Sequence, residues 1–139
     1  MVFKYMQCIF CKIIKGELLC DKVYEDDHVL AFLDIAPVNL GHILLVVKKH
    51  VESIEEVDDL LLGYVMQIVK KLGMAMKKSL KVSGYNIIIN NGATAGQVVD
   101  HFHCHIIPRY GDDGLKAWPQ KQYKGEEAKK MVNAFKSAL

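Results

Sequence analysis

The sequence predicts a single α+β domain in which an antiparallel sheet of about five strands carries one long helix on a face. The chain has 139 residues, a usual size for one domain. Apolar residues recur with a helical period over residues 57–80, and short strand-like segments bounded by turn residues lie on both sides of that stretch. We therefore treat residues 1–139 as one domain, with a helical extension over about residues 124–139.

The composition argues against several classes of protein. Apolar residues make up 51% of the chain, enough for a core, but no apolar run reaches the ~20 residues that span a bilayer. The formal net charge of +2 gives no electrostatic case for nucleic-acid binding. Lys4 and Gln7 interrupt the apolar N-terminus, so no signal peptide is predicted. We expect a cytoplasmic protein without a membrane anchor, whose four cysteines are thiols or metal ligands.

The N-terminal third contains a short helix and three strands. The apolar spacing over residues 9–18 predicts a helix ending near Gly16. Residues 23–25 and 28–34 are expected to pair as a hairpin through an acidic turn. After a loop over residues 37–41, residues 43–47 form a continuous apolar strand that is expected to be buried on both faces.

The middle and end of the chain contain the long helix, two more strands and a terminal helix. Acidic residues begin the helix at 57–80, lysines end it, and Gly84 is expected to stop it. Gly63 and Gly73 each weaken it by about 1 kcal/mol relative to alanine, and either glycine could let another element approach closely. A central strand is expected at residues 85–90 and a further strand from residue 101 to Pro108, and residues 126–139 form an amphipathic helix.

Three of the six histidines stand two residues apart in one strand. Alternate side chains of a strand share a face, so His101, His103 and His105 are expected on one side, opposite an apolar face. Packing alone gains nothing from three adjacent imidazoles, because buried polar rings need partners. The row fits a metal site, nucleophilic and acid-base chemistry on an anionic group, or an ordinary polar face.

The loop over residues 90–97 comes directly before this strand. It is small and rich in amide donors, and its two glycines let backbone N–H groups approach a ligand closely. That composition suits a phosphate, and it is also common in plain surface loops.

Several other polar residues carry more than one interpretation. Cys8 and Cys11 form a Cys-x-x-Cys pair, which could be a redox pair, two buried thiols or half of a zinc site completed by histidines. Asp34 could accept hydrogen bonds from ribose hydroxyls or start a turn. His42, at the start of a strand, is interpreted as a hydrogen-bonded structural histidine, and His50 alone as a surface residue.

The histidine row resembles the signature of the histidine triad (HIT) family, His-φ-His-φ-His-φ-φ with φ apolar, and the match is complete through Ile107. The resemblance extends over most of the chain. Within the family, the chain is similar to the Hint-like branch of bacterial or archaeal type. It implies a HIT-like α+β fold with a five-stranded sheet, one long helix, a short N-terminal helix and a C-terminal helix. The segments that carry it, besides the histidine row, are residues 8–14, 25–35, 48–50, 90–92, 96–97 and 118–119.

The resemblance also implies a reaction and a metal. His103 would attack the α-phosphorus of a purine nucleotide conjugate, forming a nucleotidyl-histidine that water hydrolyses to AMP or GMP. His105 would bind the phosphate oxygens, and His101 would complete the catalytic row. A structural zinc ion would be held by Cys8, Cys11, His50 and His101.

The substrate contacts implied by the resemblance come from three parts of the chain. Asp34 would bind the ribose. An apolar slot for the base would be formed by Ile9, Phe10, Phe32 and Ile35. The phosphate and leaving group would meet Asn90, Gln97, Val98, His103 and His105. Animal members of the branch have a serine where this chain has Val98, which leaves the leaving-group preference open.

The resemblance leaves more than one function open. The first hypothesis is a nucleoside phosphoramidate hydrolase, and the alternatives are a dinucleoside polyphosphate hydrolase, a nucleotide-binding scaffold with incidental turnover, and a zinc-binding structural module. A homodimer through the long helix and the strand at residue 85 is implied. Trp118 would either reach the partner's site or pack on its own subunit.

Overall fold

A five-stranded antiparallel sheet and one long helix form the body of the molecule in the computed structural model, which describes residues 7–139. This confirms the predicted fold class. Lys4, which contributed to the argument against a signal peptide, lies outside the described residues. The strands are β1 (Lys22–Glu25), β2 (Val29–Leu33), β3 (Ile43–Val47), β4 (Gly84–Ile88) and β5 (His103–Arg109), in the sheet order β1-β2-β3-β5-β4. The prediction that the strand near residue 85 is central is wrong, because β4 lies at the edge of the sheet. The helices are α2 (Ile9–Ile14), α3 (Asp59–Leu80) and α4 (Glu127–Ala138), with single 3-10 turns η1 (Ile54–Glu56) and η2 (Ala93–Ala95).

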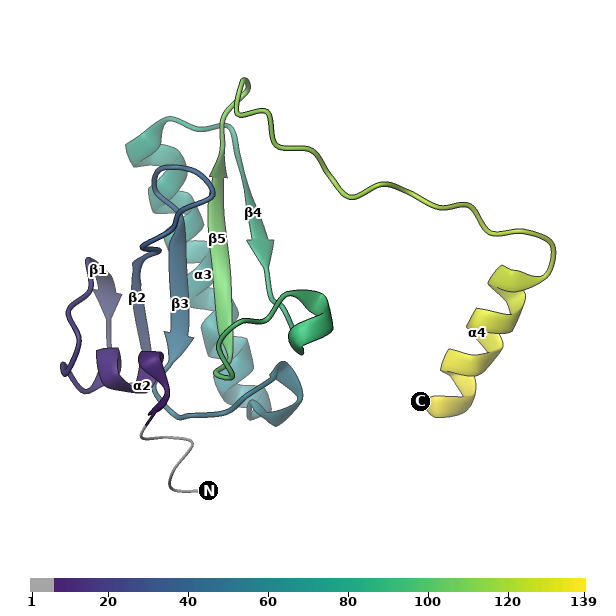
Figure 1. Ribbon diagram of the computed structural model, residues 1–139, viewed down its shortest axis with the longest axis horizontal. Coiled ribbons are helices and arrows are strands. Elements are labelled where there is room, and N and C mark those ends of the chain that lie inside the picture. The colour runs from purple at the N-terminus through teal and green to yellow at the C-terminus, as the bar shows by residue number, and fades with distance from the viewer. Residues whose placement is uncertain (1–6) are drawn as a thin grey trace.

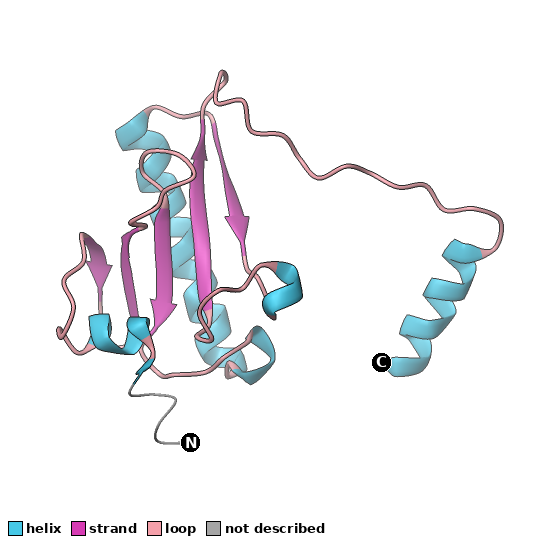
Figure 2. Cartoon of the chain, in the orientation of Figure 1, coloured by secondary structure: helices cyan, strands magenta, loops and turns pink. Residues whose placement is uncertain are grey.

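Two apolar cores cover the two faces of the sheet. Helix α3 lies along one face and the short α2 lies at the other (Figures 1 and 2). Phe102, Cys104 and Ile106 belong to the core on the α3 side, as the alternation predicts. Phe10 of α2 packs with Phe32 in the second core. Successive residues of β3 alternate between the two cores, and all five are buried, which confirms that β3 is covered on both faces.

The acidic turn between β1 and β2 is tied to α3. The Asp26 carboxylate accepts hydrogen bonds from the hydroxyls of Tyr24 (2.8 Å) and Tyr64 (2.7 Å) and from the N–H groups of His28 and Val29. Burial alone raises the pKa of Asp26, but these bonds outweigh burial and hold that pKa well below its usual range. The hairpin is therefore fixed to the helix by a charged acceptor.

Helix α3 begins and ends at slightly different residues from those predicted. Asp58 caps it by accepting the N–H groups of Leu60 and Leu61, so the helix starts at Asp59. Lys81 adopts the left-handed conformation (φ +53°) and ends the helix. The prediction that Gly84 stops the helix is wrong: Gly84 is the first residue of β4.

Pro108 lies inside β5, which corrects the prediction that it ends this strand. The pairing of β5 with β3 stops at Ile106, and beyond that residue β5 pairs with β4 alone. A proline is tolerated where one side of a strand has no ladder to complete.

The C-terminal segment leaves the body of the domain. Arg109 and Asp113 form a double ion pair (2.7 and 3.0 Å) where the segment starts. Every residue from 114 to 139 is exposed, and α4 lies apart from the sheet (Figure 1). In the described part of the chain, no helix combines the length and apolarity needed to cross a membrane.

Candidate active site

His103, the predicted nucleophile, lies where the chain enters β5. His101 lies just before the strand, fully buried, and its carbonyl oxygen is 2.7 Å from Nδ1 of His103. A carbonyl can only accept a hydrogen bond, so Nδ1 of His103 carries the hydrogen and Nε2 carries the lone pair. Burial lowers the pKa of His103, while the bond to the carbonyl opposes that shift. His103 is thus a neutral imidazole with Nε2 free to act as a nucleophile.

His105 stands beside it on the same face, with the two rings 5.0 Å apart. Its Nδ1 lies 2.9 Å from Nε2 of His42, the first residue before β3. Burial, together with the neighbouring His103 and His42, lowers the pKa of His105 to about 4. Both histidines are therefore uncharged near neutral pH.

A cavity of about 700 Å³ opens in front of these two rings, a volume that suits a small-molecule ligand. With the exception of Gln97, every substrate-binding residue named from the sequence lines it: Ile9, Phe10, Phe32, Asp34, Ile35, Asn90, Val98, His103 and His105. The fold brings these residues together from five separate segments of the chain.

The cavity has a buried floor and an exposed rim. Phe10 and Phe32 are buried and meet edge to face with their centroids 5.8 Å apart. Ile35 and Val98 are almost fully exposed at the mouth. Asp34 accepts the N–H of Ala36 through Oδ1 (2.9 Å), so it starts a turn and also lines the cavity. Both interpretations of Asp34 from the sequence are therefore compatible with its place.

Residues 18–21 also line the cavity, and sequence reasoning did not find them. Leu19, which is 98% exposed, belongs to this segment. No local pattern distinguishes the segment from an ordinary connection between a helix and a strand, since only the packing of α2 beside β2 brings it to the site.

Gln97 is buried and holds the loop over residues 90–97 in shape. Its Oε1 accepts the N–H of Gly92 (2.7 Å), and its Nε2 donates to the carbonyls of Glu52 (2.7 Å) and Val99 (3.0 Å). These bonds engage the amide group of the side chain. The role of Gln97 toward a phosphate stays a prediction, and its neighbours Gly96, Val98 and Val99 are the residues that line the cavity.

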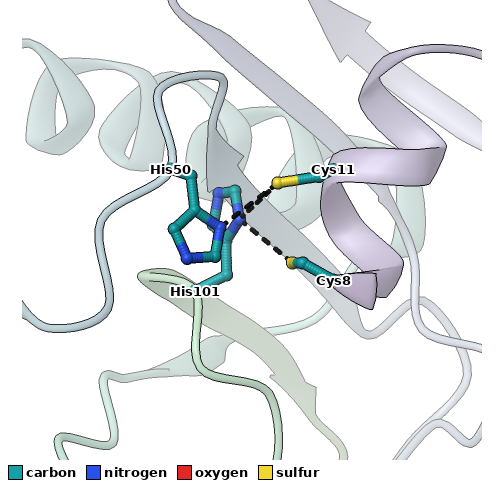
Figure 3. Close-up of side chains that lie close together, drawn as sticks. All are labelled: Cys8, Cys11, His50 and His101. Carbon is teal, nitrogen blue, oxygen red and sulfur yellow. Dashed lines mark hydrogen bonds between the residues drawn. The ribbon is translucent and has the colours of Figure 1, made fainter. Parts of the chain in front are cut away.

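A second cluster joins the base of the histidine strand to α2 (Figure 3). Cys8 Sγ is 3.5 Å and Cys11 Sγ is 3.6 Å from Nδ1 of His101, and Cys11 Sγ is 3.2 Å from Nδ1 of His50. All four ligand atoms lie within 4.8 Å of one another. The four metal ligands named from the sequence are therefore brought together.

The chemistry of this donor set fits zinc. His101 Nε2 lies 2.7 Å from the carbonyl of Val47, so Nε2 carries the hydrogen and the lone pair of Nδ1 faces the thiols. Burial lowers the pKa of His101 to about 4, which keeps it neutral. Two thiols and two imidazoles make a Cys₂His₂ set of the kind that binds zinc tetrahedrally.

The domain is α+β, and on β5 the neutral histidines His103 and His105 face a nucleotide-sized cavity. A Cys₂His₂ cluster lies at the start of the same strand. Together these features define a histidine-triad type of domain. A family model described as "HIT domain" matches residues 15–112. The chain belongs to the HIT family.

Its relatives include proteins named for enzymatic activities. An uncharacterized HIT-like protein of Methanocaldococcus jannaschii is 57% identical over 107 residues, 77% of this chain and 82% of the relative. An adenosine 5′-monophosphoramidase of Schizosaccharomyces pombe is 40% identical over 136 residues, 96% of this chain and 99% of the relative. An adenylylsulfatase of Arabidopsis thaliana is 43% identical over 110 residues, 79% of this chain and 56% of the relative.

Solved structures share the architecture. A member of the HIT family from Bacillus subtilis superposes with a TM-score of 0.88 at 43% identity, covering 96% of this chain and 97% of the other. A zinc-bound histidine triad protein from Mycobacterium smegmatis superposes with a TM-score of 0.77 at 30% identity, covering 97% of this chain and 99% of the other.

Proposed function

We propose that this protein hydrolyses purine nucleoside phosphoramidates at the α-phosphate. The observation that carries the proposal is His103, whose Nδ1 donates to the His101 carbonyl (2.7 Å) so that the Nε2 lone pair is available at a nucleotide-sized cavity. The monophosphoramidase and adenylylsulfatase relatives support a substrate that has an adenylyl group and a small leaving group.

The reaction follows from these groups in two displacements. His103 Nε2 attacks the α-phosphorus, and the P–N bond to the leaving amine breaks as the N–P bond forms. The departing nitrogen takes the bonding pair and a proton from solvent, and it leaves as the free amine. Water then attacks phosphorus and gives up a proton to solvent, His103 Nε2 leaves with its electron pair, and the nucleoside monophosphate is released. Throughout, Nδ1–H of His103 stays bonded to the His101 carbonyl, which stabilises the positive charge on the substituted ring.

The other cavity residues bind different parts of the nucleotide. The apolar floor at Phe10 and Phe32 takes the base, Asp34 takes the ribose hydroxyls, and His105 contacts the phosphate oxygens. The backbone N–H of Val98 lies in the segment that faces the leaving group. Because residue 98 is valine, its side chain offers the leaving group no hydroxyl.

We propose a structural zinc ion at Cys8, Cys11, His50 and His101, supported by the converging donor atoms and by the zinc-bound Mycobacterium smegmatis relative. Zinc would tie α2 to the entry of β5 and so fix the His101 carbonyl that orients His103. The metal would take no part in the displacement.

We also propose that the protein acts as a homodimer joined through α3 and β4. Ile87 on β4 and Met74 on α3 are apolar and partly exposed (43% and 63%). Neither lines the cavity, so ligand binding there does not explain their exposure. No residue of the 12-residue α4 is buried by the part of the chain that the structure describes, and an isolated helix of that length is marginal in water. Exposed apolar surface of this kind is typical of a subunit interface.

The test of the reaction compares three substrates that differ only in the leaving group: adenosine 5′-phosphoramidate, adenylyl sulfate and diadenosine tetraphosphate. We expect the phosphoramidate to be cleaved fastest and His103→Ala to lower kcat/KM by roughly 10⁴-fold or more. A rapid quench should trap an adenylyl adduct on wild-type protein that His103→Ala cannot form. His28→Ala, which changes an exposed histidine outside the cavity, is the matched control and should keep wild-type rates.

Two results would overturn the proposal. If AMP binds but none of the three substrates is cleaved, the chain is a binding protein. If diadenosine tetraphosphate is cleaved fastest, the chain is a dinucleoside polyphosphate hydrolase with the same nucleophile.

A further inference from the structure

His42 is a buried histidine next to the catalytic pair whose ring is enclosed by its own loop. It is 2% exposed, and it does not line the cavity. The backbone N–H of Val38 donates to its Nδ1 (3.1 Å), and its Nε2 lies 2.9 Å from Nδ1 of His105. Gly41, at φ +95°, makes the turn that closes the loop, and a Cβ there would lie 2.6 Å from Leu80. The ring is therefore held from both of its nitrogens.

These two hydrogen bonds determine where the hydrogens are. A backbone N–H can only donate, so Nδ1 of His42 must be a lone pair. A neutral imidazole carries one hydrogen, which is then on Nε2, and Nε2 donates to His105. Nδ1 of His105 is thus an acceptor, and its own hydrogen lies on Nε2.

A charged form of either ring does not fit this arrangement. Protonating His105 at Nδ1 would set two N–H groups against each other across 2.9 Å. Protonating His42 at Nδ1 would do the same with Val38. Asp34 does not change this, because its Oδ2 is 3.7 Å from Nδ1 of His42, beyond hydrogen-bond distance. Burial lowers the pKa of His42 as well, in the same direction.

We infer that His42 is a positioning residue that holds His105 in the Nε2–H form, as a neutral hydrogen-bond donor to the phosphate oxygens. The inference rests on the proposed function and adds a residue that the family signature at residues 101–107 does not contain. His103 and His105 are then held in opposite tautomers, because one has a hydrogen-bond acceptor at Nδ1 and the other has a donor. A carbonyl makes Nε2 of His103 a lone pair that attacks, and an N–H makes Nε2 of His105 a donor that stabilises.

The arrangement matters most when negative charge grows on the phosphate oxygens. A donor fixed before the reaction stabilises that charge without reorganisation. If His105 turned its Nε2 lone pair to the phosphate, two electron-rich atoms would face each other. Loss of the His42 donor should therefore lower kcat more than it changes KM, by roughly 10- to 100-fold.

Two variants separate the two bonds of His42. In His42→Asn the amide stands near the position of Nδ1, so it can accept from Val38 but cannot reach His105. In His42→Gln the amide stands near the position of Nε2, so it can donate to His105. We expect His42→Asn to lose 10- to 100-fold in kcat on adenosine 5′-phosphoramidate, and His42→Gln to restore most of that loss.

The direct readout is the state of the His105 ring nitrogens in ¹⁵N-histidine NMR spectra of the full chain. In the wild type, Nδ1 should be of the unprotonated type and Nε2 of the protonated type, and His42→Asn should show a mixture. Circular dichroism and zinc content, unchanged in both variants, confirm that the fold is intact.

The outcomes keep the inference apart from the proposed reaction. If His103→Ala is inactive but His42→Asn keeps the wild-type kcat, or if the His105 nitrogen signals do not change in His42→Asn, the inference is wrong and the reaction stands. If His103→Ala keeps the wild-type rate in the same assay, the proposed function fails. A third outcome concerns His42→Gln with an intact fold. If this variant is as slow as His42→Asn although its NMR spectrum shows the wild-type form of His105, the tautomer of His105 does not control the rate. The inference is then wrong as well.

Discussion

At the scale of single residues, the site depends on where hydrogens sit on imidazole rings. His101 shows this most directly, because its two polar ends serve two centres. Its ring presents Nδ1 to the cysteines, and its carbonyl accepts Nδ1–H of His103. A change at the proposed zinc site would therefore alter the orientation of His103, the proposed nucleophile, through His101 alone, without any contact between the metal and the substrate.

Removing a cysteine ligand should remove the metal and lower thermal stability. Cys8→Ser or Cys11→Ser leaves a weaker oxygen donor in a set that would hold zinc through two thiolates. The binding free energy of a structural zinc contributes to the free energy of folding. We expect about one zinc per chain in the wild type and little in either variant, with a lower Tm, measured by elemental analysis and calorimetry.

Cys20→Ser is the matched control for this prediction, because Cys20 lies outside the cluster. It should retain the wild-type zinc content. Full zinc content in Cys11→Ser would contradict the assigned ligand set.

At the scale of elements, the two glycines of α3 have different roles that the sequence left open. A Cβ on Gly73 would lie 2.3 Å from the ring of Tyr85, so this glycine lets β4 pack closely against the helix. A Cβ on Gly63 would meet nothing within 4 Å. Gly63 is exposed, and it weakens the helix without an evident packing role.

Alanine substitutions at these two glycines should therefore have opposite effects. Gly63→Ala should raise the free energy of unfolding by about 0.5–1 kcal/mol, because alanine is the better helix former. Gly73→Ala should lower it by about 1–2 kcal/mol, because the Tyr85 ring must move. Chemical denaturation measures both.

A double variant checks the cause. Tyr85→Leu removes the ring that Gly73→Ala would strike, so the two changes together should cost less than the sum of their separate effects. Simple additivity would show that the ring contact is not the reason for the glycine.

At the scale of the whole molecule, the domain leaves apolar surface on one edge of its sheet and along its C-terminal segment. Ile87 pairs with Ile106 in the ladder and so lies on the α3 face at the β4 edge. Trp118 is 79% exposed in the extended segment before α4. Within one chain, the described residues do not cover this tryptophan. Whether Trp118 reaches the partner's site or packs on its own subunit therefore depends on how the protein assembles.

A charge at the β4 edge should break the proposed dimer. We expect Ile87→Glu to convert a dimer to a monomer in sedimentation equilibrium. Val23→Glu, on β1 at the opposite edge and equally exposed (46% against 43%), should leave the dimer intact. Trp118 is the only tryptophan, so its emission should move to longer wavelength when the dimer dissociates. A monomeric wild type at micromolar concentration would contradict the proposal.

Local patterns determined much of this structure. The period-2 alternation places Cys104 and Ile106 in the α3-side core and His103 and His105 on the other face, because the direction of a strand side chain depends only on its neighbours. The 3.6-residue period located α3 to within two residues. The predicted metal ligands and cavity residues were named from a resemblance. The structure brings all of them together except Gln97, and it adds residues 18–21 to the cavity.

Partners that come from distant parts of the chain were decided by the tertiary structure. His42 meets His105 because β3 lies beside β5, although 63 residues separate the two in sequence. The packing of β4 against α3 likewise distinguishes Gly73, which faces the Tyr85 ring, from Gly63. The sequence by itself determined which side chains each element presents and to which face. Only the tertiary structure decided which nitrogen of each histidine carries the hydrogen, because that depends on a partner's lone pair or N–H and not on the histidine.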